Sequence, residues 1–312
     1  MVSVSVENIK KSYNKTRALR GVSFEVSQGE LFGIIGADGA GKSTIFRILT
    51  TLILPDSGRA AVEGYDVVSE YVKIREIVGY MPGRFSLYQD LSVEENLKFF
   101  ATLFNTSVNE NYDMIKDIYS YLKPFKSRKA GALSGGMKQK LALCCALIHR
   151  PKVLFLDEPT TGVDPVSRKD FWAMLKRLKE EGIAILVSTP YMDEAALCDR
   201  IALIDGGMFL RTDTPENIVK NFRREIISVS SSDMHSLLKD LRTIDQAQNC
   251  YSFGETHHVI FSEGVNYCDL SQIADYLSQR GHNDIEIKRI EPTIEDCYML
   301  LEGGRHLNKY DK

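Results

Sequence analysis

A glycine-rich octapeptide that follows an apolar run and precedes a helical pattern constrains this chain more than any other feature. It has the spacing GxxxxGK[ST] and consists of Gly36, Ala37, Asp38, Gly39, Ala40, Gly41, Lys42 and Ser43. Glycines let backbone N–H groups converge on an anion, and the N-terminus of the following helix adds a positive dipole. The octapeptide therefore predicts a strand, loop and helix that bind phosphate groups, with Lys42 at the β and γ phosphates and Ser43 as a ligand of Mg²⁺.

Two adjacent carboxylates, Asp157 and Glu158, follow a second continuous apolar run at 153–156. Such runs indicate buried parallel strands, and the ligands of parallel sheets bind at the carboxyl ends of the strands. Beside a magnesium nucleotide, Asp157 would hold the metal through a water molecule, and Glu158 would orient or deprotonate the attacking water. The alternative, a solvated acidic pair after a strand, would not explain Lys42 and Ser43 at the same sheet edge.

The order of patterns predicts two domains. An α/β unit spans 1–222, with an all-helical insert at about 90–150, and a small ferredoxin-like α+β domain spans 223–312. In the first domain we expect strands at 3–9, 21–26, 31–35, 153–156 and 183–187, and helices at 42–49, 93–103, 112–122 and 165–179. In the second we expect strands at 226–229 and 285–290, two strands around 253–261, and helices at 234–241 and 270–277.

Charge and hydropathy argue against nucleic acid as a partner and against a segment that spans a membrane. The chain has 312 residues with 39 basic and 42 acidic side chains, a formal net charge of −3, which argues against nucleic acid. The longest apolar run, 141–148, is far shorter than the roughly 20 residues that cross a bilayer. The N-terminal segment alternates like a strand and differs from a signal peptide. We therefore expect a cytoplasmic protein.

The cysteines show neither a CxxC pair nor a metal-like spacing with the histidines. They are Cys144, Cys145, Cys198, Cys250, Cys268 and Cys297. This distribution indicates reduced and mostly buried thiols.

Residues 133–139 complete the set of motifs. Ser134, Gly135 and Gly136 within them would begin a helix and so could offer donors to a phosphate. This segment resembles the signature motif of ABC-type ATPases. With the phosphate loop and the acidic strand, it makes about residues 1–220 resemble that family. The resemblance implies a P-loop (RecA-like) ABC ATPase core with a helical signature subdomain, and ATP and Mg as cofactors.

The same resemblance implies roles for further residues. The phosphate loop would extend to Thr44, and 161–165 falls where that family has its D-loop. In the family the signature residues serve the nucleotide of the other protomer, which implies a second ATP-binding subunit, in a homodimer or a heterodimer arranged head to tail. Tyr13, at the position of the family's aromatic A-loop, would stack on adenine. A plain surface tyrosine is the alternative for Tyr13.

Three segments narrow the resemblance to the ATP-binding subunits of ABC-2 type exporters, the drug and polyketide export group. They are 291–302, 189–195 and 84–91. This group implies an integral-membrane permease as partner, with the ATPase peripheral on the inner face of the cell membrane.

The surface that meets the permease is expected between the sheet core and the helical insert. Exposed apolar residues in a loop suit burial against a partner, and this loop holds Arg84, Phe85, Leu87 and Tyr88. Packing within the chain's own insert is the alternative.

Two positions depart from the family. Gly83 stands where the Q-loop glutamine is usual, and Pro190 stands where the H-loop histidine is usual. We therefore predict an ATP-hydrolysing motor subunit that is slow on its own. One alternative is a degenerate regulatory subunit with little turnover. Another is an ABC protein acting on ribosomes, but the members of that group carry two ATP-binding units per chain.

Overall fold

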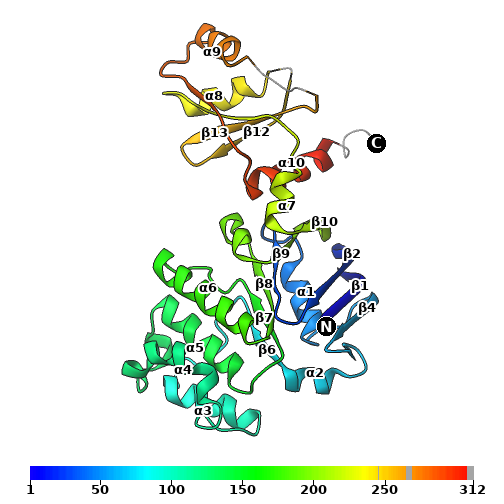
Figure 1. The fold of residues 1–312 in the computed structure, drawn as a ribbon, viewed down its shortest axis with the longest axis vertical. Helices are drawn as coiled ribbons and strands as arrows, with labels where there is room; N and C mark the ends of the chain where they lie inside the picture. The colour runs from blue at the N-terminus through cyan, green and yellow to red at the C-terminus, as the bar shows by residue number, and fades with distance from the viewer. Residues whose placement is uncertain (245, 265–268, 308–312) are drawn as a thin grey trace. The chain divides into compact units, whose positions relative to one another are not determined.

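The structure is a computed structural model that describes residues 1–244, 246–264 and 269–307. The chain divides into two compact units, Met1–Asp213 and Thr214–Lys312 (Figure 1). The domain boundary expected from the sequence lies at 222. The difference concerns the helix α7 (Pro215–Lys220), which packs against α10 (Ile294–Leu307) and is therefore part of the second unit.

A six-stranded sheet forms the centre of the first unit, in the order β10-β9-β3-β8-β7-β6. Its strands are β3 (Leu31–Ile35), β6 (Val78–Met81), β7 (Val153–Asp157), β8 (Ala184–Thr189), β9 (Arg200–Asp205) and β10 (Met208–Asp213). All neighbours are parallel except β10, which pairs antiparallel with β9. Every residue of β3, β7 and β8 is buried, which confirms the expectation drawn from their continuous apolar runs.

An antiparallel sheet in the order β2-β1-β4-β5 is the second layer of this unit. Its strands are β1 (Val2–Tyr13), β2 (Thr16–Ser27), β4 (Ser57–Val62) and β5 (Tyr65–Asp66). The helix α1 (Lys42–Leu49) contributes to one apolar core with residues of both sheets. Strands β1 and β2 extend beyond the predicted ranges because the polar, exposed tip of their hairpin carries no apolar alternation.

Helices complete the first unit. They are α2 (Tyr71–Ile77), α3 (Val93–Leu103), α4 (Tyr112–Leu122), α5 (Gly135–Leu147) and α6 (Pro165–Glu180), with short 3-10 turns at Lys123–Phe125, Ala130–Ala132 and Met192–Leu197. Helices α3, α4 and α5 form the predicted insert, in which α5 contacts the other two. A capping box between Ser92 and Glu95 starts α3. Helix α6 packs on β3 and β8.

The second unit has the ferredoxin-like fold that the sequence predicts. Its strands are β11 (Ile226–Ser230), β12 (Ala247–Phe253), β13 (Thr256–Phe261) and β14 (Glu286–Arg289), and its other helices are α8 (Met234–Leu241) and α9 (Leu270–Gln279). The sheet order is β12-β13-β11-β14, antiparallel throughout. Residues of α8 and α9 share one core with the sheet, and residues of α10 belong to a second cluster with Tyr251 and Ile260.

The described cysteines are buried, as the sequence predicts. All five cysteines in the described part of the chain are free and buried, while Cys268 lies outside it. Burial raises the pKa of the Cys250 thiol to about 12, so this thiol is unreactive at neutral pH. Among the described residues, no helix has the length and apolar character needed to cross a bilayer.

Candidate nucleotide site

The phosphate loop connects β3 to α1 at the carboxyl edge of the parallel sheet. Two of its glycines have no room for a side chain. A Cβ at Gly36 would lie 2.2 Å from the carbonyl oxygen of Ile204, and one at Gly41 would lie 2.6 Å from that of Ala18. Gly41 also has a φ of +111°. Glycine is therefore required at both ends of the loop.

Lys42 is the first residue of α1, and its side chain is 3% exposed. Its ammonium Nζ donates to the carbonyl oxygens of Gly36 at 2.8 Å and Ala37 at 3.0 Å. Nζ also lies 3.2 Å from Oε1 of Glu158 and 3.9 Å from the exposed carboxylate of Asp38. The loop thus holds a buried cation whose nearest carboxylate is that of Glu158, directly after β7.

Ser188, the fifth residue of β8, connects the two acidic residues. Its hydroxyl donates to Oδ1 of Asp157 at 2.6 Å and accepts from the backbone N–H of Glu158 at 3.0 Å. The carbonyl of Ser188 accepts from the same N–H at 3.1 Å. These bonds hold Glu158 at a φ of +51°, a left-handed conformation that is uncommon for a residue with a side chain. Burial and the nearby Asp157 carboxylate raise the pKa of Tyr80 to about 12.

The oxygen donors at this edge fit a magnesium nucleotide. The Ser43 hydroxyl follows Lys42, and Asp157 is 4% exposed with a carboxylate fixed by Ser188. Hydroxyl and carboxylate oxygens are the ligands that Mg²⁺ prefers, together with phosphate oxygens. No group of three or more His, Cys, Asp or Glu in the described part of the chain could hold a metal ion. An ion held by Ser43 and Asp157 beside phosphate oxygens would neutralise phosphate charge.

Gly83 lies beside Asp157, and Pro190 lies at the end of β8. A Cβ at Gly83 would be 3.2 Å from the carbonyl oxygen of Asp157 and 3.8 Å from its carboxyl carbon. A longer side chain at position 83 would therefore start next to Asp157. Pro190 directly follows the last residue of β8, Thr189, whose hydroxyl accepts from the N–H of Tyr191 at 3.0 Å.

The signature residues lie at the start of α5. Ser134 is the N-cap, and its hydroxyl accepts from the N–H of Met137 at 3.4 Å. A Cβ at Gly135 would be 3.1 Å from the carbonyl oxygen of Gly162, and one at Gly136 would be 2.7 Å from Oγ of Ser167. The glycines of this motif thus contact the segment after β7 and the first turn of α6 in their own chain.

Four further predicted residues, Tyr13, Gly39, Ala40 and Thr44, have simple surroundings. Tyr13 ends β1, is 41% exposed, and has the ammonium of Lys11 5.9 Å from its ring centre. Thr44 is buried, and its N–H donates to the carbonyl of Gly41 at 3.1 Å. Gly39 has a φ of +79° and open space where a Cβ would stand, while Ala40 is buried.

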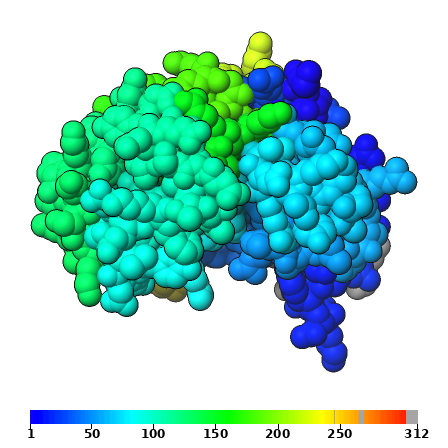
Figure 2. All heavy atoms as spheres, turned by 90° about the horizontal axis from the view of Figure 1, so that it is seen from below, coloured from blue at the N-terminus to red at the C-terminus, as the bar shows by residue number. Residues whose placement is uncertain are grey.

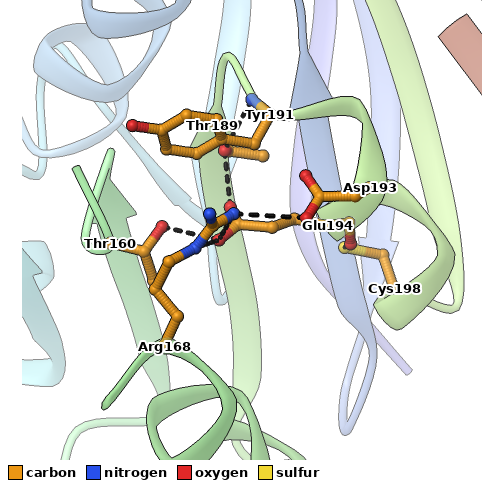
Figure 3. Close-up of polar contacts among 7 residues, drawn as sticks. All are labelled: Thr160, Arg168, Thr189, Tyr191, Asp193, Glu194 and Cys198. Atoms are coloured by element: carbon orange, nitrogen blue, oxygen red, sulfur yellow. Dashed lines mark hydrogen bonds and ion pairs between the residues drawn. The ribbon is translucent and has the colours of Figure 1, made fainter. Parts of the chain in front are cut away.

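The sequence reasoning missed a second buried carboxylate near the site, Glu194. It is 2% exposed and lies in the 3-10 turn after β8. Hydrogen bonds connect it to Thr160, Arg168 and Thr189 (Figure 3). Glutamate next to aspartate in a polar segment suggests only a solvated turn, so no local signal could have identified this residue.

The fold and the loop define a P-loop nucleotide-binding unit, and comparisons with known proteins identify its family. Residues 19–161 match the family model described as "ABC transporter". The "Linearmycin resistance ATP-binding protein LnrL" of Bacillus subtilis is 36% identical over 305 residues, which cover 96% of this chain and 98% of that protein. The chain therefore belongs to the ATP-binding proteins of ABC transporters, and it resembles their ABC-2 type group.

Two other comparisons show how far the similarity extends. The "Probable multidrug ABC transporter ATP-binding protein YbhF" of Escherichia coli is 40% identical over 218 residues, 69% of this chain but only 38% of that longer relative. A solved structure described as the dimeric structure of a bacterial ABC transporter cassette has a TM-score of 0.62 and 26% identity. It covers 68% of this chain, which spans 98% of that cassette.

Proposed function

We propose that this chain is the ATP-binding and ATP-hydrolysing motor subunit of a membrane exporter, which dimerises on ATP and drives a separate permease. One observation carries the proposal: the phosphate loop presents the buried ammonium of Lys42 within 3.2 Å of the Glu158 carboxylate, at the edge where Asp157 also lies. In this role Lys42 binds phosphate oxygens, and Ser43 and Asp157 hold Mg²⁺. Glu158 takes a proton from the attacking water.

A second ATP-binding subunit would complete the site. Gly135 lies next to Gly162 in the segment after β7, and Gly136 lies next to Ser167 of α6, so the helix N-terminus that begins at Ser134 is available to another nucleotide. The dimeric cassette among the similar structures supports this arrangement. Tyr13 is exposed enough for its ring to stack on adenine.

The permease surface is proposed at a hollow between α2 and the helical insert (Figure 2). A cavity of about 820 Å³ lies there, and exposed apolar side chains of Leu52, Val72 and Leu103 line it together with Arg84 and Phe85. An amphipathic segment of a membrane protein would cover these side chains, which would place the chain on the inner face of the cell membrane.

The expected loop contributes unevenly to that surface. Leu87 lines the cavity but is only 8% exposed, so most of its side chain packs inside the chain. Tyr88 is 51% exposed and contacts the ring of Phe99, with ring centres 4.8 Å apart. Tyr88 is therefore exposed to a partner at the edge of this surface, whereas Leu87 offers it little exposed area.

The test of the proposal is ATP binding and membrane association of the full chain. In calorimetry with MgATP, Lys42→Ala should weaken binding roughly 10- to 150-fold, because a charge-assisted hydrogen bond to phosphate contributes about 1.5 to 3 kcal/mol. The control is Lys129→Ala, which removes an exposed lysine. Gentle extraction from membranes should recover the chain with an integral-membrane protein. Equal affinities of the two variants would refute the assignment of the phosphate loop.

A regulatory subunit with little turnover is the second candidate, and the positions of Gly83 and Pro190 favour it. Both stand beside Asp157 or β8 without a polar side chain, and proline also lacks an N–H. Each hydrogen bond lost from the transition state costs about 10² to 10³ in rate. The isolated chain should therefore bind ATP but hydrolyse it slowly, and a partner chain with a complete site should speed turnover. Pro190→His should raise the slow rate, whereas brisk cooperative hydrolysis by the isolated homodimer would exclude this candidate.

A further inference from the structure

Glu194 accepts four hydrogen bonds from three separate segments of the first unit. Its Oε1 accepts from the Thr160 hydroxyl at 2.8 Å and from Nε and Nη2 of Arg168 at 3.1 and 2.9 Å. Its Oε2 accepts from the Thr189 hydroxyl at 2.6 Å. Figure 3 shows these side chains converging on the carboxylate. A carboxylate that is 2% exposed is costly to bury, and this set of donors offsets the cost.

Each of the three segments belongs to the proposed ATP site. Thr160 lies two residues after Glu158 on the same loop, and Thr189 ends β8 directly before Pro190. Arg168 lies in the first turn of α6, next to Ser167, which contacts the signature residue Gly136. One carboxylate therefore connects the loop of the general base, the end of β8, and the helix that packs on the signature motif.

The bonds also fix the chain path around Pro190. Because proline has no N–H, the first backbone donor after Thr189 is that of Tyr191, and it donates back to the Thr189 hydroxyl at 3.0 Å. That hydroxyl is oriented by its own bond to Glu194. The guanidinium of Arg168 lies 4.3 Å from the ring centre of Tyr191 and holds the other side of the turn.

We propose that Glu194 is a positioning residue for ATP turnover, which acts by keeping the Glu158 loop and the turn at Pro190 in place relative to each other. It contacts neither the phosphate loop nor Glu158 in the structure, so it contributes through Thr160, Thr189 and Arg168. The inference rests on the proposed function, since it concerns the same site. It predicts that changes at Glu194 alter the chemical step and leave ATP affinity almost unaltered.

The experiment compares Glu194→Gln with Asp193→Asn in the full chain. Both variants replace an acid by its amide, and both acids contact the Arg168 guanidinium. Asp193, however, is 76% exposed and 3.4 Å away. Release of phosphate is measured in single turnover, and the Kd of MgATP is measured separately. For Glu194→Gln the rate should fall about 10- to 100-fold with Kd unchanged, because small displacements of reacting groups cost rate rather than binding. Asp193→Asn should resemble the unaltered chain.

A second pair of variants covers the case in which Glu194→Gln does not fold. Thr189→Val removes one hydroxyl and leaves the Arg168 ion pair in place, and Thr189→Ser restores the hydroxyl. The rate should fall for the valine variant and recover toward normal for the serine variant, again without a change in Kd.

The outcomes separate this inference from the function on which it rests. If Lys42→Ala leaves ATP binding intact, the proposed function fails. If Lys42→Ala abolishes binding while Glu194→Gln turns over ATP at the normal rate, the positioning role alone is wrong. Equal losses of rate in Thr189→Val and Thr189→Ser would also overturn it.

Discussion

The two units each contain a buried carboxylate that joins several segments, and the donors differ. Glu194 in the first unit accepts from Arg168, a permanent cation, and from two threonines, Thr160 on the loop after β7 and Thr189 at the end of β8. Asp296 in the second unit is fully buried and accepts from Tyr251, from Nδ1 of His258, and from the N–H and hydroxyl of Thr293.

This difference in donors indicates that the two buried carboxylates have different roles. The bonds of Asp296 form a capping box at the start of α10 and attach that helix to β12 and β13. They close a small domain, whereas those of Glu194 connect segments that belong to the proposed ATP site. Changes in the first unit should therefore affect turnover, and changes around Asp296 should affect stability.

The largest effect is expected for Glu158→Gln. The amide keeps the shape of the side chain but cannot accept a proton, so ATP turnover should fall about 10² to 10⁴-fold. The variant also removes the carboxylate that lies 3.2 Å from the Lys42 ammonium, which frees the cation for phosphate. ATP should therefore bind more tightly and trap a dimer that gel filtration detects. Asp296→Asn is the control, and normal turnover by Glu158→Gln would show that another group is the base.

Asp296→Ala should produce the largest loss of stability in the second unit. It leaves the Tyr251 hydroxyl, the His258 ring N–H and the Thr293 N–H without their acceptor in a buried place. We expect a loss of about 3 kcal/mol in the free energy of unfolding of this unit. Hydrogen exchange of the β13 amides would measure it.

Asp275→Ala, which changes an exposed residue of α9, is the matched control for that measurement. The Kd of MgATP should not change in either variant. A weaker Kd in Asp296→Ala alone would contradict the separation of the two units' roles.

The sequence predicted the features that depend on neighbouring residues, and it did not predict those that depend on residues far apart in the chain. The phosphate loop, β7 and the ferredoxin-like order depend on short patterns, and the structure contains them. The bonds of Ser188 to Asp157 and of Glu194 to Thr160 join residues 31 and 34 positions apart. They depend on the register of β7 beside β8, which no local pattern specifies.

Short or exposed elements were missed for another reason. Helix α2 has seven residues, and Tyr71 and Val72 in it are exposed, so its apolar residues do not mark a buried face. Strand β4 contains serine, glycine, arginine and alanine, and Val62 is its single β-branched residue. Both elements are stabilised by the sheet and helices around them, which a reading of local preference cannot include.

As the pH falls, protonation of His149 should lower the stability of the first unit before Asp296 in the second unit is protonated. This ring stacks on Phe104 with centres 3.8 Å apart, and its Nε2 contacts the carbonyl oxygen of Val78 at 3.0 Å. Burial lowers the pKa of His149 to about 4, despite the opposing effect of that hydrogen bond. The unfolded chain therefore binds a proton near pH 6.5 and the folded chain does not. The contribution of the neutral ring to stability is complete above pH 6.5, and stability falls by about 3 kcal/mol as the pH drops toward 4.

The bonds of Asp296 should persist over the same range. Burial raises the pKa of this carboxyl. The hydrogen bonds from His258, Thr293 and Tyr251 together lower it by more, so the net pKa is below the ordinary value. Its contribution to stability is complete above about pH 4 and is lost only at lower pH. Unfolding by urea at several pH values would show the difference. His149→Phe should flatten the slope between pH 6.5 and 4, and exposed His235→Phe should not.

The smallest effect, and the sharpest test of where the units separate, concerns chains that end at Asp213 or at Asn221. Both should bind MgATP with a Kd within about twofold of the full chain, because every group placed at the nucleotide precedes residue 213. They should differ in α7. Its Pro215 and Ile218 are buried, it packs against α10, and Cys297 of α10 contacts the carbonyl of Ile218 at 3.7 Å.

Without α10, a helix of six residues is too short to persist in water. The amides of 215–220 in the chain that ends at Asn221 should therefore exchange at the rate of an unfolded segment, while those of β3 and β8 stay protected. Protection of 215–220 in that chain would move the boundary to residue 222, where the sequence places it. Loss of ATP binding in a folded chain that ends at Asp213 would mean that the second unit contributes to the nucleotide site, and the two buried carboxylates would then serve one function instead of two.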